Sequence, residues 1–357
     1  MKLRNIILVV VIFATIIVSA SYVFCNIINI RSFEIDGIYY EIVDDMSIKV
    51  TYKGSDWKAY EHEYSGVVVI PNKLTYRGRN YSVTEIGDYA FSDCSKMTSI
   101  FIPASVWHIG FCAFSSCDGL KEIHINDLSS WCELSFYDIA DDAGDSPLNY
   151  AEGLYLNGEL ITNLVVPEDV THIGAHAFEG YEKLRSVVLP QGIEAIYKSA
   201  FLNCTNLTSI NIPADVYYIG PYAFDSTSWY ENMPDGVIYA GAHLYKYKGE
   251  MPFNTSVVVK EGTATICESA FDCRAELTSI TLPSSLKQIH DYAFNGCDNL
   301  KEVYCRSLTP PSINSSYNNF HNDVVIYVPK GTREAYREAS RLFENVVESD
   351  FSNKNLE

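Results

Sequence analysis

The stretch IPASVWHIGFCAFSSCDGLKEIHI, residues 102–125, decides how this chain folds. Its Ala-Phe pair recurs along the chain, with phenylalanines at Phe91, Phe114, Phe178, Phe201, Phe224, Phe271 and Phe294. Four of the six intervals between them equal 23 residues, and the other two are 64 and 47. A fixed period of this length is typical of a repeat architecture, in which each unit packs against its neighbours.

Within one period the apolar residues are separated by two, three or four positions, which fits neither a long helix nor a simple meander. The segment NLTSINIP, residues 206–213, places Ile210 and Ile212 two apart and predicts a short strand that Pro213 ends. Residues 215–220 predict a second strand. One unit buries too little to fold alone, so the units must stack, with equivalent strands about 4.8 Å apart in a parallel sheet.

The motif IPxxVxxIGxxAFxxCxxLxxI, residues 102–123, resembles that of the BspA-like leucine-rich repeats, also called the Treponema-type repeats. Further copies lie at residues 166–187, 189–210, 265–280 and 282–303. The resemblance implies a mainly β fold, a right-handed leucine-rich-repeat solenoid with a parallel concave sheet, over residues 83–328. It also implies a secreted or surface-displayed bacterial protein that binds other proteins or cell surfaces.

Residues outside the regular repeats predict caps and insertions. Residues 33–82 predict an N-terminal β-rich cap with hairpin turns at Asp36-Gly37 and around Gly78. Residues 329–357 predict a helical cap, because an open coil end would expose the core. Hairpin insertions are expected near residues 126–165 and 226–258, with turns at Asn157-Gly158 and Ala240-Gly241. We expect one domain in which these hairpins interrupt the repeat without ending the sheet.

The N-terminus predicts export. Lys2 and Arg4 precede an apolar run and a small-residue site, which predicts a signal peptide over residues 1–20. Residues 6–30 carry no charge, so an uncleaved membrane anchor is an alternative, and lipid attachment at Cys25 is another. In each case the basic residues stay cytoplasmic and the repeats lie outside the inner membrane. The protein is therefore expected to be secreted or held at the cell surface.

Cysteines follow the repeat in four Ala-Phe-x-x-Cys segments, at Cys94, Cys117, Cys204 and Cys297. One thiol per coil forms a line, whereas zinc requires a tetrahedral cluster. Side chains that point the same way into a core also suit a disulfide poorly. These four cysteines are predicted to be buried, unbridged and packed as small hydrophobes. The better disulfide candidates lie off this line, at Cys112, Cys132, Cys267, Cys273 and Cys305.

Charge and motifs limit the function classes. The net charge of -19 opposes binding to nucleic acid. The sequence contains no nucleophile-elbow, zinc-protease or phosphate-loop motif, so we predict a non-enzymatic protein with no catalytic residue, cofactor or metal. His172 and His176 are four apart but fall in a predicted strand and turn. The four aspartates of residues 138–145 do not match a calcium-loop pattern.

Function is therefore expected to lie in a surface. The residues that flank each inward Ile or Val of the first strand should point outward and form a candidate binding face. These residues are Thr98, Ser99, Phe101, Lys121, Glu122, His124, Arg185, Ser186, Val188, Thr208, Ser209, Asn211, Thr278, Ser279, Thr281, Lys301, Glu302 and Tyr304. Trp107, Tyr217 and Tyr218 form a second exposed set on the other strand. We expect an extracellular or host protein as the partner, with a glycan as the alternative.

Overall fold

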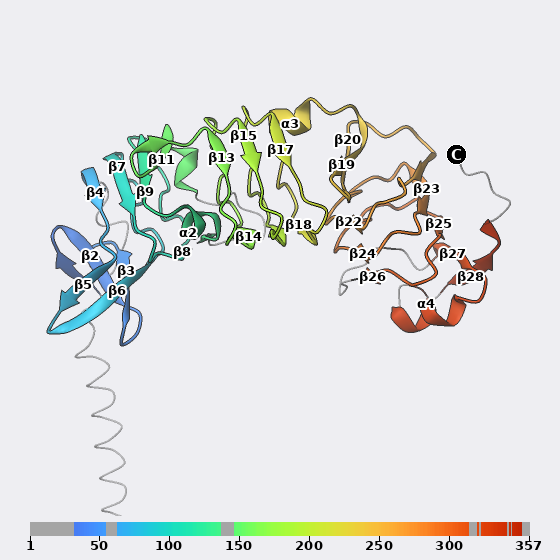
Figure 1. The fold of residues 1–357 in the computed structure, drawn as a ribbon, viewed down its shortest axis with the longest axis horizontal. Helices are drawn as coiled ribbons and strands as arrows, with labels where there is room; N and C mark the ends of the chain where they lie inside the picture. The colour runs from blue at the N-terminus through green and yellow to red at the C-terminus, as the bar shows by residue number, and fades with distance from the viewer. Residues whose placement is uncertain are drawn as a thin grey trace, which may run out of the picture.

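The computed structural model describes residues 32–54, 63–136, 146–313, 320, 323–340, 343 and 345–351. The predicted signal peptide or anchor, Cys25 and the acidic loop at residues 138–145 lie outside these ranges. Figure 1 shows the described coils following one another along an arch. The predicted β-solenoid of leucine-rich-repeat type is confirmed.

Most coils contribute one longer and one shorter strand. The longer strands pair in parallel within three blocks. The first block contains β4 (Ser65–Val69), β7 (Lys96–Ile102), β9 (Glu122–Ile125) and β11 (Gly153–Leu156), and the second contains β13 (Asn163–Val165), β15 (Ser186–Val188) and β17 (Ser209–Asn211). The third block contains β21 (Thr255–Val258), β23 (Leu277–Leu282), β25 (Glu302–Cys305), β27 (Val325–Pro329) and β28 (Val346–Ser349). The outward side of these strands is called the long-strand face below; we expected it on the concave side.

The shorter strands form a second line. They are β8 (His108–Ile109), β10 (Ser135–Phe136), β14 (His172–Ile173), β16 (Ala195–Ile196), β18 (Tyr218–Ile219), β22 (Thr265–Ile266), β24 (Gln288–Ile289) and β26 (Ser312–Ile313). At the N-terminal end this line continues through β6 (Arg79–Ile86), β3 (Ser47–Thr51), β2 (Ile38–Ile42) and β1 (Phe33–Ile35). In Figure 1 the labels β14, β18, β24 and β26 lie toward the inner side of the arch.

The repeated phenylalanines stack into a ladder inside the coils. The ring of Phe201 lies 5.5 Å from that of Phe178 and 6.0 Å from that of Phe224, with interplanar angles of 8°. The backbone N–H of Phe201 donates to the carbonyl of Ala223 at 2.9 Å, one coil onward. Irregular coils continue the ladder with other aromatic residues, which are Tyr64, Tyr245, Tyr247 and Phe320.

The cysteine line lies beside this ladder and is buried, as predicted. Three of these thiols donate to the phenylalanine carbonyl of the preceding coil: Cys117 to Phe91 at 3.0 Å, Cys204 to Phe178 at 3.0 Å and Cys297 to Phe271 at 3.1 Å. Burial raises the pKa of the Cys297 thiol to about 12. These cysteines therefore join adjacent coils by hydrogen bonds, in addition to filling space as small hydrophobes.

The off-line cysteines form no disulfide, because all nine described cysteines carry thiols. The five candidates occupy unlike environments. Cys132 is buried in helix α2 (Leu128–Cys132), Cys267 and Cys305 are buried in the core, Cys112 is half-buried and Cys273 is exposed.

The N-terminal end of the described chain has the predicted hairpin turns, whereas the C-terminal end has a shorter helix than predicted. The turns at Asp36-Gly37 and Arg77-Gly78 have positive φ at both residues, and they join β1 to β2 and β5 (Lys73–Tyr76) to β6. At the other end, the helix α4 covers only Arg333–Ala339, and β28 then pairs in parallel with β27. The prediction of helix through the whole C-terminal segment is wrong there. That these segments act as caps stays a prediction.

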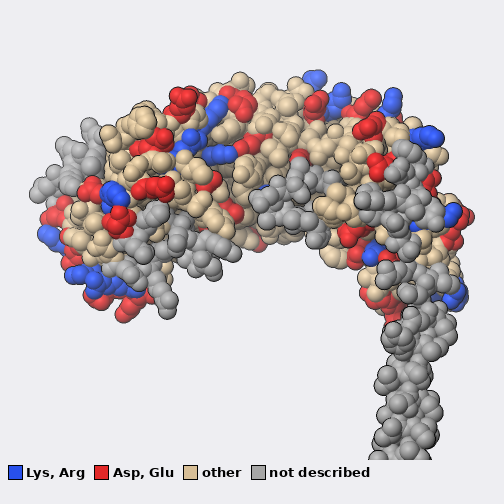
Figure 2. Space-filling view, turned by 180° about the vertical axis from the view of Figure 1, so that it is seen from behind, with Lys and Arg blue, Asp and Glu red and all other residues tan. Residues whose placement is uncertain are grey.

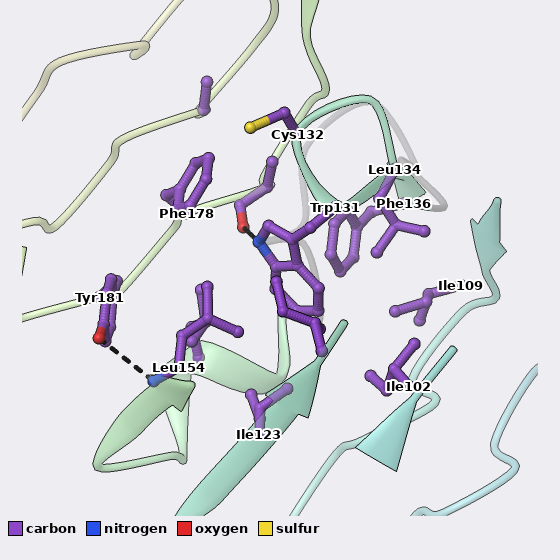
Figure 3. Close-up of a cluster of buried hydrophobic side chains, with 14 of the residues drawn as sticks. Ile102, Ile109, Ile123, Trp131, Cys132, Leu134, Phe136, Leu154, Phe178 and Tyr181 are labelled. Carbon is purple, nitrogen blue, oxygen red and sulfur yellow. Dashed lines mark hydrogen bonds between the residues drawn. The ribbon is translucent and has the colours of Figure 1, made fainter. Parts of the chain in front are cut away.

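The first hairpin insertion ends a block of the sheet. β11 pairs in parallel with β9, and Asn157-Gly158 turns the chain into β12 (Glu159–Leu160), which runs antiparallel beside β11. β12 occupies the edge at which the next coil would pair, so the described sheet stops there. Figure 3 shows how side chains fill this region: Trp131 Nε1 donates to the carbonyl of Ala177 at 3.1 Å, and Tyr181 accepts from Leu154 N.

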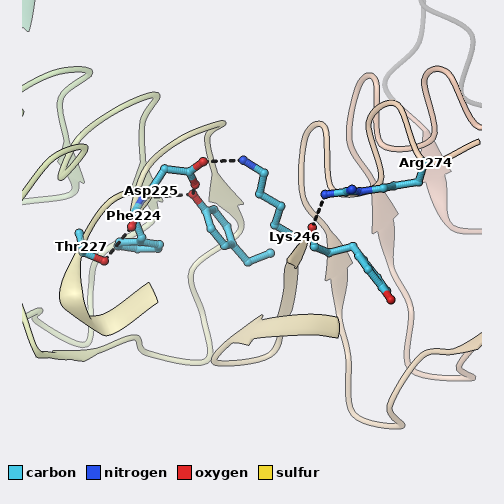
Figure 4. A network of polar contacts seen from close by, with 7 residues as sticks. Phe224, Asp225, Thr227, Lys246 and Arg274 are labelled. Atoms are coloured by element: carbon cyan, nitrogen blue, oxygen red, sulfur yellow. Dashed lines mark hydrogen bonds and ion pairs between the residues drawn. The ribbon is translucent and has the colours of Figure 1, made fainter. Parts of the chain in front are cut away.

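The second insertion also ends a block, contrary to our expectation of a continuous sheet. β19 (Gly236–Ala240) and β20 (His243–Lys248) form a hairpin that joins the shorter strands through β22, so β17 and β21 are not paired in the described chain. Side chains cross the break instead (Figure 4). Tyr245 donates to Asp225 Oδ1 at 2.7 Å, and the Lys246 ammonium pairs with the same carboxylate. Arg274 Nη2 donates to the carbonyl of Tyr247 at 3.0 Å.

Candidate binding face

A row of apolar and aromatic residues crosses the N-terminal block of the long-strand face. Strand register places Val69 beside Phe101, Phe101 beside His124, and His124 beside Tyr155. These residues alternate along their strands with core residues, so their side chains share the outward face. Val69, Phe101 and His124 lie along a pocket of about 620 Å³, which is lined by Val67, Val69, Thr98, Ser99, Phe101, Lys121, Glu122, His124, Ile125, Asn157 and Gly158.

The pocket combines an apolar wall with a charged rim. The His124 ring stacks on the Tyr155 ring at 5.0 Å, and its Nε2 lies 3.0 Å from Glu122 Oε2. Val67 and Val69 remain 69% and 59% exposed, so this part of the sheet offers apolar surface to a partner. Aromatic side chains surrounded by a polar rim are typical of the core of a protein–protein interface.

The first third of the predicted face comes together in this pocket. Its six predicted residues, Thr98, Ser99, Phe101, Lys121, Glu122 and His124, all line it. The middle third, Arg185, Ser186, Val188, Thr208, Ser209 and Asn211, lies on or beside β15 and β17. There the outward row continues through Val165, Val188 and Asn211, without aromatic residues. The aromatic part of the face is therefore confined to its ends.

The last third of the predicted face is less accessible than expected. Thr278, Ser279, Thr281, Lys301, Glu302 and Tyr304 lie on or beside β23 and β25, but Thr281 and Tyr304 are only 3% and 8% exposed. Tyr304 is covered because its ring stacks on Tyr327 at 4.7 Å. Thr281 lies in register between Val258 and Tyr304. Burial, and then the neighbouring Glu302 carboxylate, raise the pKa of Tyr304 to about 12.

The pocket also contains residues that we did not predict, including Val67, Val69 and Asn157, and Tyr155 stacks on its His124. We assigned residues 33–82 to a cap and therefore did not place β4 in the repeat. The signal was present in the sequence: Ile70-Pro71 ends β4 as Ile102-Pro103 ends β7.

The second candidate surface lies along the shorter strands. Trp107 and Tyr217 are exposed, whereas Tyr218 is half-buried and donates to Glu268 at 2.9 Å. His172 lies in β14, and His176 lies in the following turn, where it contacts the buried Glu179. In the ranges that the structure describes, no group of three or more His, Cys, Asp or Glu side chains is arranged to hold a metal ion.

The charge on the surface is mixed. Figure 2 shows acidic and basic side chains interspersed over the face turned to the viewer. The whole chain nevertheless has 45 acidic against 26 basic residues, so its long-range field is negative. No helix among the described residues is both long enough and apolar enough to cross a membrane.

Three solved structures to which this chain is similar are bacterial proteins. A leucine-rich cell surface protein from Faecalibacterium prausnitzii is 22% identical, with a TM-score of 0.36, over 87% of this chain and 97% of that one. A leucine-rich repeat protein from Bacteroides ovatus is 19% identical, with a TM-score of 0.29, over 89% and 100%. The pneumococcal vaccine antigen PcpA is 16% identical, with a TM-score of 0.36, over 89% and 98%.

No curated protein matches the chain. The family described as the BspA type leucine rich repeat region matches in six copies, over residues 72–141, 152–248 and 232–339. These matches extend over more than half of the sequence and include β7 and β9, two of the strands that line the pocket. The chain belongs to the BspA-type leucine-rich repeat family.

Proposed function

We propose that the chain is an exported, non-enzymatic binding protein whose N-terminal part of the long-strand face attaches to another extracellular protein. The pocket lined by Phe101, His124, Val67 and Val69 is the observation that carries this proposal. Membership of a family of surface leucine-rich repeat proteins supports a scaffold role. A negative net charge supports a protein partner rather than a nucleic acid.

Phe101 is the expected anchor of this contact. It lies at the centre of the outward row, between Val69 and His124, so a partner that covers the pocket must desolvate its ring. Truncating an aromatic hot-spot residue removes about 2 kcal/mol or more of binding free energy, which is about thirtyfold in Kd. The polar residues Lys121 and Glu122 at the rim would then set orientation and partner choice.

The test is a binding screen against arrays of purified extracellular proteins and of glycans, followed by titration of each hit. Phe101→Ala should weaken the protein hit about thirtyfold. Trp107→Ala is the matched control, because Trp107 is an exposed aromatic beside the shorter strands. Binding that is unaffected by Phe101→Ala, or that is lost with Trp107→Ala, would move the site elsewhere. Binding to glycans alone would contradict a protein partner.

A further inference from the structure

The N-terminal block of the long-strand sheet ends at an open edge. Its strand order is β12, β11, β9, β7 and β4, and among the described residues no strand pairs with the outer edge of β4. Figure 1 shows β4 at the outer end of this block. Edge strands offer a row of backbone donors and acceptors that can pair with another chain. The side chains of Val67 and Val69 on this strand are largely exposed.

The hydrogen bonds of β4 show which backbone groups are available. Ile70 N donates to the carbonyl of Phe101 in β7 at 3.1 Å, so the backbone groups of Ile70 and Val68 point toward β7. In a parallel pair alternate residues point to opposite edges. The N–H and C=O groups of Val67 and Val69 therefore point away from β7, toward the open side.

A groove lies along this open side. It has a volume of about 820 Å³ and is lined by β4 residues 65 and 67–69, by the β1–β2 hairpin and by β5. β4 has five residues, so it can pair along its length with an extended segment of about five residues.

The chemistry around the groove selects the side chains of such a segment. On one face a strand beside β4 would extend the row formed by Val69, Phe101 and His124, which favours apolar residues. Toward the hairpin, the groove lining combines apolar and aromatic side chains with two carboxylates, Asp36 and Glu63, and one ammonium, Lys73. The net charge of -19 adds to this negative field.

We infer that β4 binds an extended segment of the partner protein as an added parallel or antiparallel strand, with alternating apolar and basic residues. This inference rests on the proposed function and specifies how part of the partner is held. The main-chain hydrogen bonds of Val67 and Val69 supply affinity, and the alternating side chains supply selectivity. The partner therefore contacts the β4 edge and the Phe101 pocket at the same time.

The first experiment uses a synthetic peptide of about nine alternating valine and lysine residues, titrated against the full chain. Val69→Pro removes the outward N–H without removing a donor to β7, and should weaken peptide binding about tenfold. Val165→Pro is the matched control, because Val165 is an exposed residue of β13, at the end of another block, and its N–H likewise points away from the neighbouring strand; peptide binding should change less than about threefold. Circular dichroism establishes that each variant is folded.

The second experiment measures amide hydrogen exchange in the unaltered protein, so it does not depend on the proline variant folding. The peptide should slow exchange at Val67 and Val69 and leave Val165, on another block, unchanged. No binding, equal binding by Val69→Pro, or unchanged exchange at both valines would overturn the inference. Dimers that pair through β4 would also overturn it, because a second copy would then be the occupant. If the β4 inference fails but binding of a partner protein still requires Phe101, the proposed function remains supported.

Discussion

Truncation of one rung in the phenylalanine ladder should destabilise the protein far more than loss of an exposed phenylalanine. Phe201 is fully buried, and Phe178 and Phe224 stack on its two sides. Replacement of a buried phenylalanine by alanine typically lowers the free energy of unfolding by about 3–5 kcal/mol. The two neighbouring rungs are held in place by backbone hydrogen bonds between coils, so they cannot collapse into the cavity. We therefore expect about 5 kcal/mol for Phe201→Ala.

Urea unfolding, followed by far-ultraviolet circular dichroism, measures this loss directly. Phe201→Leu keeps most of the apolar volume and should cost about 2 kcal/mol. Phe253→Ala is the control, since Phe253 is 88% exposed and its loss should change stability by less than about 0.5 kcal/mol. A loss below about 2 kcal/mol for Phe201→Ala, or equal losses for Phe201→Ala and Phe253→Ala, would refute the ladder as a source of stability.

Three other predictions concern the burial of single side chains. Burial, and then the neighbouring His290, lower the pKa of His243 from 6.5 to about 4, so the unfolded chain binds a proton that the folded chain does not. The free energy of unfolding should therefore fall by roughly 3 kcal/mol as the pH drops from about 6.5 to 4. His243→Gln should reduce this loss of stability at low pH. If urea unfolding gives the same pH profile for His243→Gln as for the unaltered protein, the prediction is wrong. Cys204→Ala should lower the free energy of unfolding by about 1–2 kcal/mol, because it removes a buried sulfur and its hydrogen bond to Phe178. In the native protein an alkylating reagent should modify the exposed Cys273 and spare Cys204; rapid modification of Cys204 would contradict its burial.

The regular coils were predictable because one short motif determines both the period and the inward positions. Ala113, Phe114 and Cys117 recur with the same spacing, and the structure buries each of them. The irregular coils were harder because their aromatic residues differ in type and spacing. Tyr245 and Tyr247 continue the ladder from within a strand, with no Ala-Phe pair to indicate it.

The residues of the long-strand face were predictable only where the alternation of inward and outward side chains along a strand determines which residues point outward. Alternation correctly placed Phe101 and His124 outward, beside one pocket. It could not show that Tyr304 is covered, because the covering ring of Tyr327 comes from the next coil, where the motif is absent. It also could not show which strand ends a sheet, since that depends on pairing partners such as β12 and β20.

The breaks between the strand blocks have a mechanical consequence. Within a block, a bend must distort several parallel backbone hydrogen bonds together, so each block resists bending as a stiff plate. Between β17 and β21 in the described chain, the load passes instead through side-chain contacts such as those of Tyr245 and Lys246 with Asp225. These contacts are fewer and carry more rotatable bonds than a backbone ladder. Under a pulling force between its ends, the arch should therefore bend at the breaks between blocks before it bends within them, while the β4 edge and the Phe101 pocket keep their shape within one plate.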